Sequence, residues 1–406
     1  MNNPFFDNIE RYPMEVIAAG HGAELVGVDN EGTGRIWLDF WSDESTQGGG
    51  YDLSEMLREF AASAIPHQLP DIYPNDVRTR LANRLLETYG FNKVFFGNSG
   101  ADAIETAIKI ARKYQWKKGN GKRLLYTLKG NFHGRSLGAL GLSDSIGSGS
   151  PYHKRGFATN PVDSSLHLEG KSWQGYGVID ETLPLESQVD LEHAAAIFMA
   201  PILGNNVVKG YDPAFLRELR EFCTKHDILL VFDEIQTGSG WTGHYSAAQM
   251  YGVQPDMMTL GKRIAYGFPM SATLASERLA ETIGLGEHFN TFAGSPFVCW
   301  FADKWLDFLG SGGLAEIAEK GAEINNQLWA IPSIKKVNRY GMMISFLPDY
   351  ERLGRNGREI CKEAFDHDLL IVTHRPDGEI RFTPPIAVTY EQINRACAVL
   401  RSILAD

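Results

Sequence analysis

The sequence predicts an α/β sheet wrapped by helices, followed by a smaller α+β domain. Three observations support this. The 406 residues suffice for two or three packed units. Residues 51–290 alternate short apolar runs with amphipathic stretches, as in α/β proteins. After about residue 295 the pattern changes to helices interspersed with short strands. We therefore expect an N-terminal segment (1–45), a large domain (46–295) and a small C-terminal domain (296–406).

In the N-terminal segment, residues 35–40 are strand-like, and we expect this segment to pack against the small domain. The large domain contains short apolar runs that predict buried strands, at Lys93–Phe96, Arg123–Leu128, Ala195–Met199, Ile228–Phe232 and Met257–Thr259. Residues 101–114 place isoleucine and alanine on one side and basic residues on the other, which predicts a helix. Residues 142–185 are rich in Gly, Ser and His and predict a long surface loop near the site.

The small domain is predicted to combine four helices with three strands. The helical patterns lie at Val298–Phe308, Leu314–Leu328, Gly357–Phe365 and Tyr390–Leu404. The strand patterns lie at Gly341–Phe346, Leu370–Thr373 and Glu379–Phe382.

Composition excludes several classes of function. A net charge of -11 gives no electrostatic footprint for nucleic acid. The four cysteines form no Cys-x-x-Cys pair, which argues against a zinc site or a disulfide frame, and we expect no metal. The longest apolar run, residues 194–203, is too short for a membrane helix, and no signal peptide is apparent. We expect a cytoplasmic protein that binds neither membrane nor nucleic acid.

A small-residue turn opens the helix predicted at 101–114. Residues 97–102 would present unpaired backbone N–H groups at the positive end of the helix dipole, an arrangement suited to a phosphate. A serine that merely caps the helix would have the same appearance, so both interpretations remain open.

An acid and an amine each follow a predicted strand. Asp233 ends one apolar strand, at the edge where open α/β sheets bind ligands, and could pair with a cationic ring nitrogen. Lys262 follows the next strand, where partial desolvation lowers a lysine pKa and frees the amine for Schiff-base chemistry. The separation, 262 − 233 = 29 residues, accommodates one helix and a return strand, so both groups would emerge at the same edge. Taken singly, a turn aspartate and a surface lysine are the plainer interpretations.

The segment 130–135 adds an aromatic ring and a cation. Phe132, beside glycine, could lie flat on a bound ring, and Arg135 could hold a carboxylate through two parallel hydrogen bonds. A core phenylalanine and a surface arginine are the alternatives.

In this order the segments resemble the class III aminotransferases, the family of ornithine, acetylornithine and 4-aminobutyrate aminotransferases. The resemblance extends from about Leu38 to the end of the chain. It is most specific in NSGADAIETAIKIARKY, NFHGRSLGAL, LLVFDEIQTG, GWTGHYSAAQMYGVQPDMMTLGK, TFAGSP and RFTPPI. It implies fold-type I, with a mostly parallel seven-stranded sheet in the large domain. It also implies pyridoxal 5'-phosphate (PLP) as cofactor, and a homodimer with shared active sites.

The resemblance also implies roles for single residues. Lys262 matches the Schiff-base lysine, Asp233 the partner of the pyridine nitrogen, and Gln236 the partner of the ring hydroxyl. Phe132 would stack on the ring. The phosphate would be held by Ser99, Gly100 and Ala101, with Thr291 supplied by the other subunit. Substrate carboxylates would be bound by Arg135 and Arg381, and Tyr73 would be a pocket aromatic.

Three departures from the family pattern concern substrate recognition. Asn205 stands where the family often has a glutamate that neutralises the arginine matching Arg381, so we expect Arg381 to be freer to bind anions. Trp241 replaces an arginine and is interpreted as a space-filling residue. Residues 47–51 replace the usual Gly-His-x-His-Pro, which predicts a different substrate entrance.

The predicted function is transfer of an amino group between an amine or amino acid and a 2-oxo acid such as 2-oxoglutarate. The same scaffold also carries aminomutases, decarboxylases and racemases, and a non-catalytic binding protein is the alternative from another class. The presence of both Asp233 and Lys262 argues against the last. The sequence leaves the amine donor open.

Overall fold

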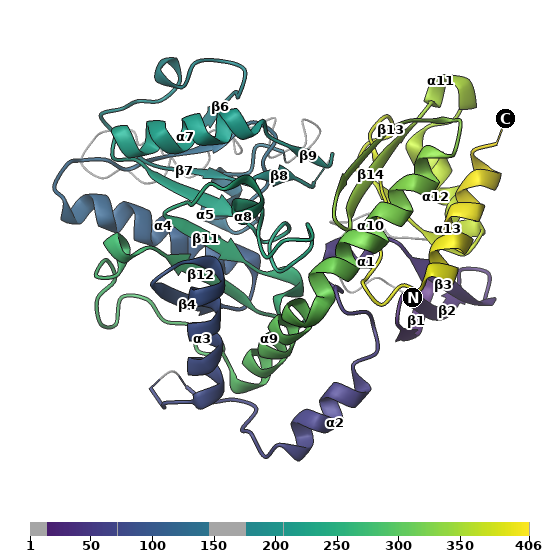
Figure 1. The fold of residues 1–406 in the computed structure, drawn as a ribbon, viewed down its shortest axis with the longest axis horizontal. Coiled ribbons are helices and arrows are strands. Elements are labelled where there is room, and N and C mark those ends of the chain that lie inside the picture. The colour runs from purple at the N-terminus through teal and green to yellow at the C-terminus, as the bar shows by residue number, and fades with distance from the viewer. Residues whose placement is uncertain (1–13, 71, 146–175, 206, 406) are drawn as a thin grey trace.

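The computed structural model describes residues 14–70, 72–145, 176–205 and 207–405. Figure 1 shows two lobes: one is built on a large sheet, and the other contains the C-terminal elements together with the N-terminal strands. Helix α9 (Pro296–Phe308) runs between the lobes and continues through Leu309–Gly313 into α10 (Leu314–Trp329). The proposed domain limits at 45/46 and 295/296 remain predictions.

The large lobe confirms the mostly parallel seven-stranded sheet. Its strand order is β4-β12-β11-β10-β7-β5-β6, and only β12 runs antiparallel to its neighbours. The strands are β4 (Lys93–Gly97), β5 (Leu124–Leu128), β6 (Tyr176–Ile179), β7 (Ala194–Met199), β10 (Leu229–Asp233), β11 (Met257–Leu260) and β12 (Ser271–Ala275). All five predicted strands are present, whereas β6 and β12 were not predicted.

Helices cover the sheet and supply its core. The predicted helix at 101–114 is α4 (Gly100–Lys117), and its apolar side is buried against β5, β7 and β10 in one hydrophobic cluster. The other helices before α9 are α2 (Ser54–Ala62), α3 (Asp76–Tyr89), α5 (Leu137–Gly141), α7 (Pro213–Lys225) and α8 (Ala247–Tyr251). Of the loop predicted at 142–185, residues 146–175 lie outside the described residues, and the described part contains β6.

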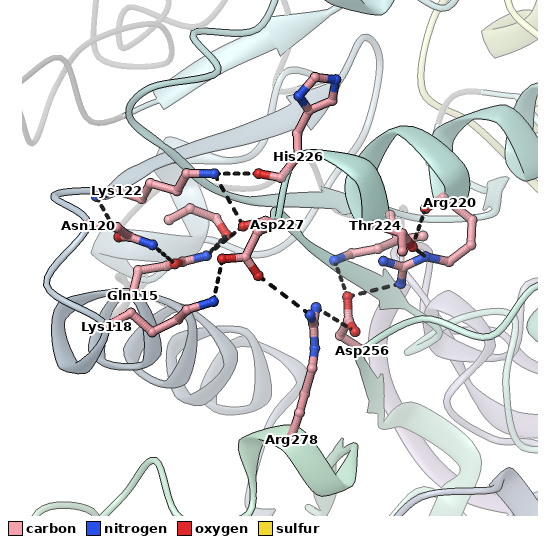
Figure 2. Close-up of polar contacts among 12 residues, drawn as sticks. Gln115, Lys118, Asn120, Lys122, Arg220, Thr224, His226, Asp227, Asp256 and Arg278 are labelled. Carbon is pink, nitrogen blue, oxygen red and sulfur yellow. Dashed lines mark hydrogen bonds and ion pairs between the residues drawn. The ribbon is translucent and has the colours of Figure 1, made fainter.

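A network of polar contacts holds the amino-terminal ends of the strands β10 and β11 in place (Figure 2). Asp256 accepts hydrogen bonds from Arg220 at 2.9 Å and from the Leu230 backbone N–H at 2.8 Å, and pairs with Arg278 at 2.7 Å. The backbone carbonyl of Asp227, in the turn before β10, accepts from Gln115 of α4 at 3.0 Å. These contacts fix the starts of β10 and β11, and therefore the register in which their carboxyl ends reach the site.

The small lobe contains the sheet β13-β14-β17-β16 with α10, α12 and α13 packed beside it. Its remaining elements are β13 (Ile334–Tyr340), β14 (Met343–Pro348), β16 (Val372–Thr373), β17 (Ile380–Arg381), α11 (Tyr350–Leu353), α12 (Gly357–Asp366) and α13 (Tyr390–Ile403). Strand β13 was not predicted. The single strand predicted at 370–373 was wrong: its first part, β15 (Leu369–Leu370), pairs with an N-terminal strand, and β16 pairs with β17.

The N-terminal strands form a second sheet with the C-terminal part of the chain. Strands β1 (Met14–His21), β2 (Glu24–Asp29) and β3 (Gly34–Asp39) are antiparallel neighbours, and β3 pairs in parallel with β15. Arg35 of β3 forms an ion pair with Asp368 at 2.8 Å. The N-terminal segment therefore lies on the C-terminal lobe, and its following turn reaches the cavity between the lobes. Within the described ranges, no helix is both long and apolar enough to cross a membrane.

Candidate active site

A cavity of about 780 Å³ lies at the carboxyl ends of the parallel strands. Its wall includes Lys262, Asp233 and Gln236 from the central strands, and Gly100 and Ala101 from the start of α4. Asp233 and Thr259 are paired in register on β10 and β11, so the residues that follow these strands face the same space. The predicted acid and amine are thus brought to one edge of the sheet.

Asp233 is buried and held by a histidine. Its Oδ2 lies 2.6 Å from Nδ1 of His133, and its Oδ1 accepts from the Ile235 backbone N–H at 3.1 Å. His133 is itself buried, with Nε2 3.1 Å from the Thr127 hydroxyl. Both His133 nitrogens therefore have partners, and the carboxylate of Asp233 is fixed in orientation at the cavity wall.

Lys262 begins a short turn directly after β11. Its backbone is left-handed, with φ of 52°, a conformation unfavourable for a residue with a β-carbon. Its Nζ donates to the backbone carbonyl of Glu44 at 2.7 Å. Burial lowers the pKa of the Lys262 ammonium to about 7, opposed by the charge of Glu44. A large fraction of this amine is therefore neutral at neutral pH, as a nucleophilic lysine requires.

The first turn of α4, where the anion site is predicted, lies at the cavity wall. Ser99 is the N-cap of α4, and its hydroxyl accepts from the Asp102 backbone N–H at 3.2 Å in a capping box. The interpretation of Ser99 as a helix cap is therefore correct. The cap still leaves the N–H groups of Gly100 and Ala101 outside the helical ladder, as at any helix start. Gly100 packs on Ile235, where an added β-carbon would lie 2.9 Å from its Cδ1, so α4 approaches the end of β10 closely.

Two further side chains match a planar ring in the cavity. The side-chain amide nitrogen of Gln236 is buried without a hydrogen-bond partner among the described residues, and Gly204 leaves room for this side chain. Phe132 lines the cavity, with the Arg135 guanidinium 5.3 Å from its ring centre. An unpaired amide donor, a buried acid, a partly neutral amine and a helix start together fit a phosphorylated pyridine.

Arg381 is not free, which corrects the expectation drawn from Asn205. The guanidinium is buried, and Nη1 pairs with Oε2 of Glu44 at 3.0 Å. Burial would raise the pKa of Glu44, but the charges of Arg381, Lys262 and His374 outweigh this effect and lower it. Asn205 lines the cavity and instead donates to the Ser145 hydroxyl at 3.1 Å. A carboxylate does neutralise Arg381, but it comes from the N-terminal segment.

Two other departures also have structural explanations. Trp241 is fully buried, and the guanidinium of Arg263 lies 4.3 Å from its ring centre, so Trp241 does more than fill space. Arg263 donates to the carbonyls of Gln236 at 2.7 Å and Ser45 at 2.8 Å. Residues 47–51, whose departure from the family motif predicts a different substrate entrance, do not line the cavity of this chain. Gly48 and Gly49 pack on the Lys262 turn, where β-carbons would collide with Arg263 and Tyr266.

Tyr73 and Thr291 do not line the cavity of their own chain. Tyr73 is 55% exposed, and Thr291 is exposed with its carbonyl accepting from the Gln68 side chain at 3.0 Å. Exposed Ile72, Phe289 and Phe292 belong to the same two segments. Within this chain, neither Tyr73 nor Thr291 forms part of the cavity wall.

Sequence reasoning missed three residues that the fold brings to this site: His133, Glu44 and His374. A signal existed for His133, because it follows Phe132 directly within a segment already singled out. His374, whose Nε2 lies 3.6 Å from Oε1 of Glu44, and Glu44 itself had no comparable motif around them.

A central acid and amine with an adjacent helix start line one cavity, and comparison with known proteins identifies the family. The aminotransferase class III family model matches residues 11–404. An acetylornithine aminotransferase from Aquifex aeolicus is 32% identical over 403 residues, covering 98% of this chain and 99% of that protein. A succinylornithine transaminase from Photorhabdus laumondii is 30% identical, and the match covers 91% of this chain and 90% of that protein.

A solved ornithine aminotransferase from Toxoplasma gondii, with PLP at partial occupancy in its active site, superposes with a TM-score of 0.82. It is 26% identical, and the match covers 98% of this chain and 91% of that one. The chain thus belongs to the class III aminotransferases and is an enzyme that transfers amino groups.

Proposed function

We propose that this chain holds PLP at Lys262 and transfers an amino group from an amine or amino acid to a 2-oxo acid such as 2-oxoglutarate. The observation that carries the proposal is that the Lys262 amine and the Asp233 carboxylate line one cavity at the ends of paired strands. The side-chain amide nitrogen of Gln236, which has no hydrogen-bond partner among the described residues, belongs to a residue of the same cavity wall. When bound, PLP supplies an aldehyde for the amino group and a pyridinium ring that withdraws electrons from the substrate carbon.

The protein's own groups have separable roles in this proposal. Asp233, oriented by His133, would keep the ring nitrogen protonated, because a neighbouring carboxylate favours the charged form. Lys262, with a pKa of about 7, can both attack a carbonyl carbon and move a proton at the substrate carbon. Gln236 would donate to the ring oxygen, and Phe132 would lie on the ring face. The backbone N–H groups of α4 would hold the phosphate with Ser99.

Substrate carboxylates would be bound by Arg381 and Arg135, since guanidinium groups pair with carboxylates through two parallel hydrogen bonds. Asn205 and Ser145 also line the cavity and are hydrogen-bonded to each other. A homodimer in which Thr291 and Tyr73 of each chain complete the other chain's site is part of the proposal. Its support is the exposure of both residues beside Ile72 and Phe292.

The proposal is tested with the coloured protein and one substrate at a time. Glutamate alone should bleach the visible absorbance of the bound cofactor, and 2-oxoglutarate should restore it. Lys262→Ala should keep no covalent label after borohydride reduction and dialysis. No bleaching with any amino donor would overturn amino-group transfer, and a label retained by Lys262→Ala would overturn the lysine assignment.

A screen with glutamate, ornithine, acetylornithine, 4-aminobutyrate, diamines and amino sugars would then identify the donor.

A further inference from the structure

Arg263, which follows Lys262 directly in the chain, is a fully buried cation. Burial and the nearby charge of Arg381 lower the pKa of Arg263 to about 9, so the guanidinium is still charged at neutral pH. It forms no ion pair with a carboxylate in the described part of the chain. Burying a charge in this way is costly, so the contacts that offset the cost show what this residue holds in place.

The hydrogen-bond partners of Arg263 are backbone carbonyls from two segments that lie far apart in the sequence. Nη1 donates to Gln236 at 2.7 Å and to Gly238 at 3.3 Å, and Nη2 donates to Ser45 at 2.8 Å. The first two carbonyls belong to the turn 235–242 that follows β10, and the third belongs to the N-terminal segment. Because both nitrogens are parts of one planar group, these carbonyls are held in fixed positions relative to the Lys262 turn.

Trp241 and Gly48 complete the surroundings of Arg263. The guanidinium carbon lies 4.3 Å from the ring centre of Trp241, which is a cation–π contact. Trp241 belongs to the turn 235–242, so this turn contacts the guanidinium through its carbonyls and through a ring. A β-carbon at Gly48 would lie 2.7 Å from Cβ of Arg263, so a larger residue there would displace Arg263. Two departures from the family pattern, Trp241 and Gly48, therefore pack on the same residue.

The turn that Arg263 holds carries a side chain that faces the cavity. The carbonyl of Gln236 accepts from Arg263, while the Gln236 side chain belongs to the cavity wall and has an amide nitrogen without a partner among the described residues. Lys262 lines the same cavity, whereas Arg263 is not among the lining residues. One residue behind the cavity wall thus connects the backbone of two residues within that wall.

We propose that Arg263 is a positioning residue that fixes the distance between Lys262 and Gln236, and with it the place of the Gln236 amide at the ring oxygen of the cofactor. A lysine cannot substitute for it, because one ammonium group cannot bond the carbonyls of two segments and also stack on Trp241. The role of Gln236 toward the cofactor rests on the proposed function, whereas the connection between the two turns does not.

Hydrogen–deuterium exchange of the full-length protein, measured by mass spectrometry of its peptides, tests the connection. Arg263→Lys should increase the exchange rate of the amides in residues 235–242 at least about tenfold, because this turn loses its contacts with the Lys262 turn. Trp241→Phe, which keeps an aromatic face, should give a smaller increase in the same residues. Arg355→Lys removes an arginine that donates to the carbonyl of Ile403 in the small lobe, and should leave residues 235–242 unchanged. Unchanged exchange in both Arg263→Lys and Trp241→Phe overturns the proposal.

A double-mutant cycle on cofactor affinity then tests whether Arg263 acts through Gln236. Arg263→Lys should weaken PLP binding about tenfold in the wild-type background and much less in the Gln236→Ala background, where the positioned amide is absent. An equal loss of affinity in both backgrounds would show that Arg263 does not act through Gln236, and overturns the proposal. A wild type that binds no PLP would refute the proposed function, and the exchange measurement would still confirm or overturn the connection between the two turns.

Discussion

The environment of single residues decides the chemistry of this site. Lys262 lies among apolar strand ends and next to two arginines, and desolvation, the largest effect, brings its pKa to about 7. Asp233 is equally enclosed but has a histidine partner at 2.6 Å. One cavity therefore contains an amine that readily loses its proton and a carboxylate held in a fixed direction.

The pKa of Lys262 predicts a pH-dependent stability. Between about pH 7 and 10.5 the unfolded chain binds a proton at Lys262 that the folded chain does not. The contribution of Lys262 to the free energy of unfolding therefore rises with pH. Below pH 7 both states are protonated, and the full penalty for burying the ammonium remains. Lys262→Met should therefore raise the melting temperature of the cofactor-free protein most at pH 6, and progressively less toward pH 9.

The control for this prediction is Lys362→Met, an exposed position on α12. The difference in melting temperature between Lys362→Met and the wild type should not change with pH. If the difference in melting temperature between Lys262→Met and the wild type is also independent of pH from pH 6 to pH 9, the lowered pKa of Lys262 is refuted.

Among the elements, the start of α4 combines a structural and a binding role. Ser99 caps the helix through Asp102, and the same turn offers its N–H groups to the cavity. The helix cap and the proposed anion site thus share Ser99, so either role alone would explain a serine at this position. A variant that separates the two roles is informative.

Ser99→Ala should lower the free energy of unfolding by about 1 kcal/mol through loss of the cap. It should also weaken cofactor binding about tenfold, because a hydroxyl donor to the phosphate is lost. Thr389→Ala removes the matching cap of α13, away from the cavity, and should reproduce only the first effect. Denaturant unfolding and cofactor titration measure the two quantities. Equal cofactor affinity in both variants would show that Ser99 caps α4 and does not bind the cofactor phosphate.

The elements predicted from sequence are those with strong local patterns. Strand β10 is an apolar run ending in Asp233 and was found, whereas β12 reads Ser-Ala-Thr-Leu-Ala, and its small residues give no comparable signal. Strand β12 exists because it is paired on both sides, with β4 and β11. The two-residue strand β17 lies within the run predicted at 379–382, whereas local sequence could not show that β15 and β16 pair with different strands.

At the scale of the whole molecule, Thr291 and Tyr73 make the proposed site depend on a second copy. Both lie outside the cavity of their own chain and are exposed. A twofold dimer would repeat such a contact at both sites, because each subunit presents the same surface to the other.

Mixing two inactive variants tests this arrangement. Lys262→Ala lacks the amine, and Thr291→Asp places a negative charge where the phosphate of the neighbouring chain would bind. In a mixed dimer, one site would combine native Lys262 with native Thr291 from the other chain. Reassembly of equal amounts should therefore restore about a quarter of the native sites, counted by cofactor absorbance and activity. No recovery would place Thr291 outside the partner's site.

The site itself was predictable where it follows from strand topology, and unpredictable where it depends on distant contacts. Asp233 and Lys262 were placed together because neighbouring parallel strands end at the same edge. Glu44 could not be found, because it lies 337 residues from Arg381 on four successive left-handed residues, none of them glycine. The expectation that Asn205 leaves Arg381 unneutralised was wrong for the same reason, because the neutralising carboxylate comes from the distant Glu44.

The pairing of β3 with β15, and of Glu44 with Arg381, also sets the order in which the molecule can mature. During synthesis residue 44 emerges long before residue 381. Strand β3 therefore cannot pair with β15 until translation is nearly complete. Until then Lys262 and Glu44 are already present, but Arg381, the ion-pair partner of Glu44, has not yet been synthesised. A nascent chain that ends just beyond the seven-stranded sheet would thus contain Lys262 and Arg135 but not yet Arg381.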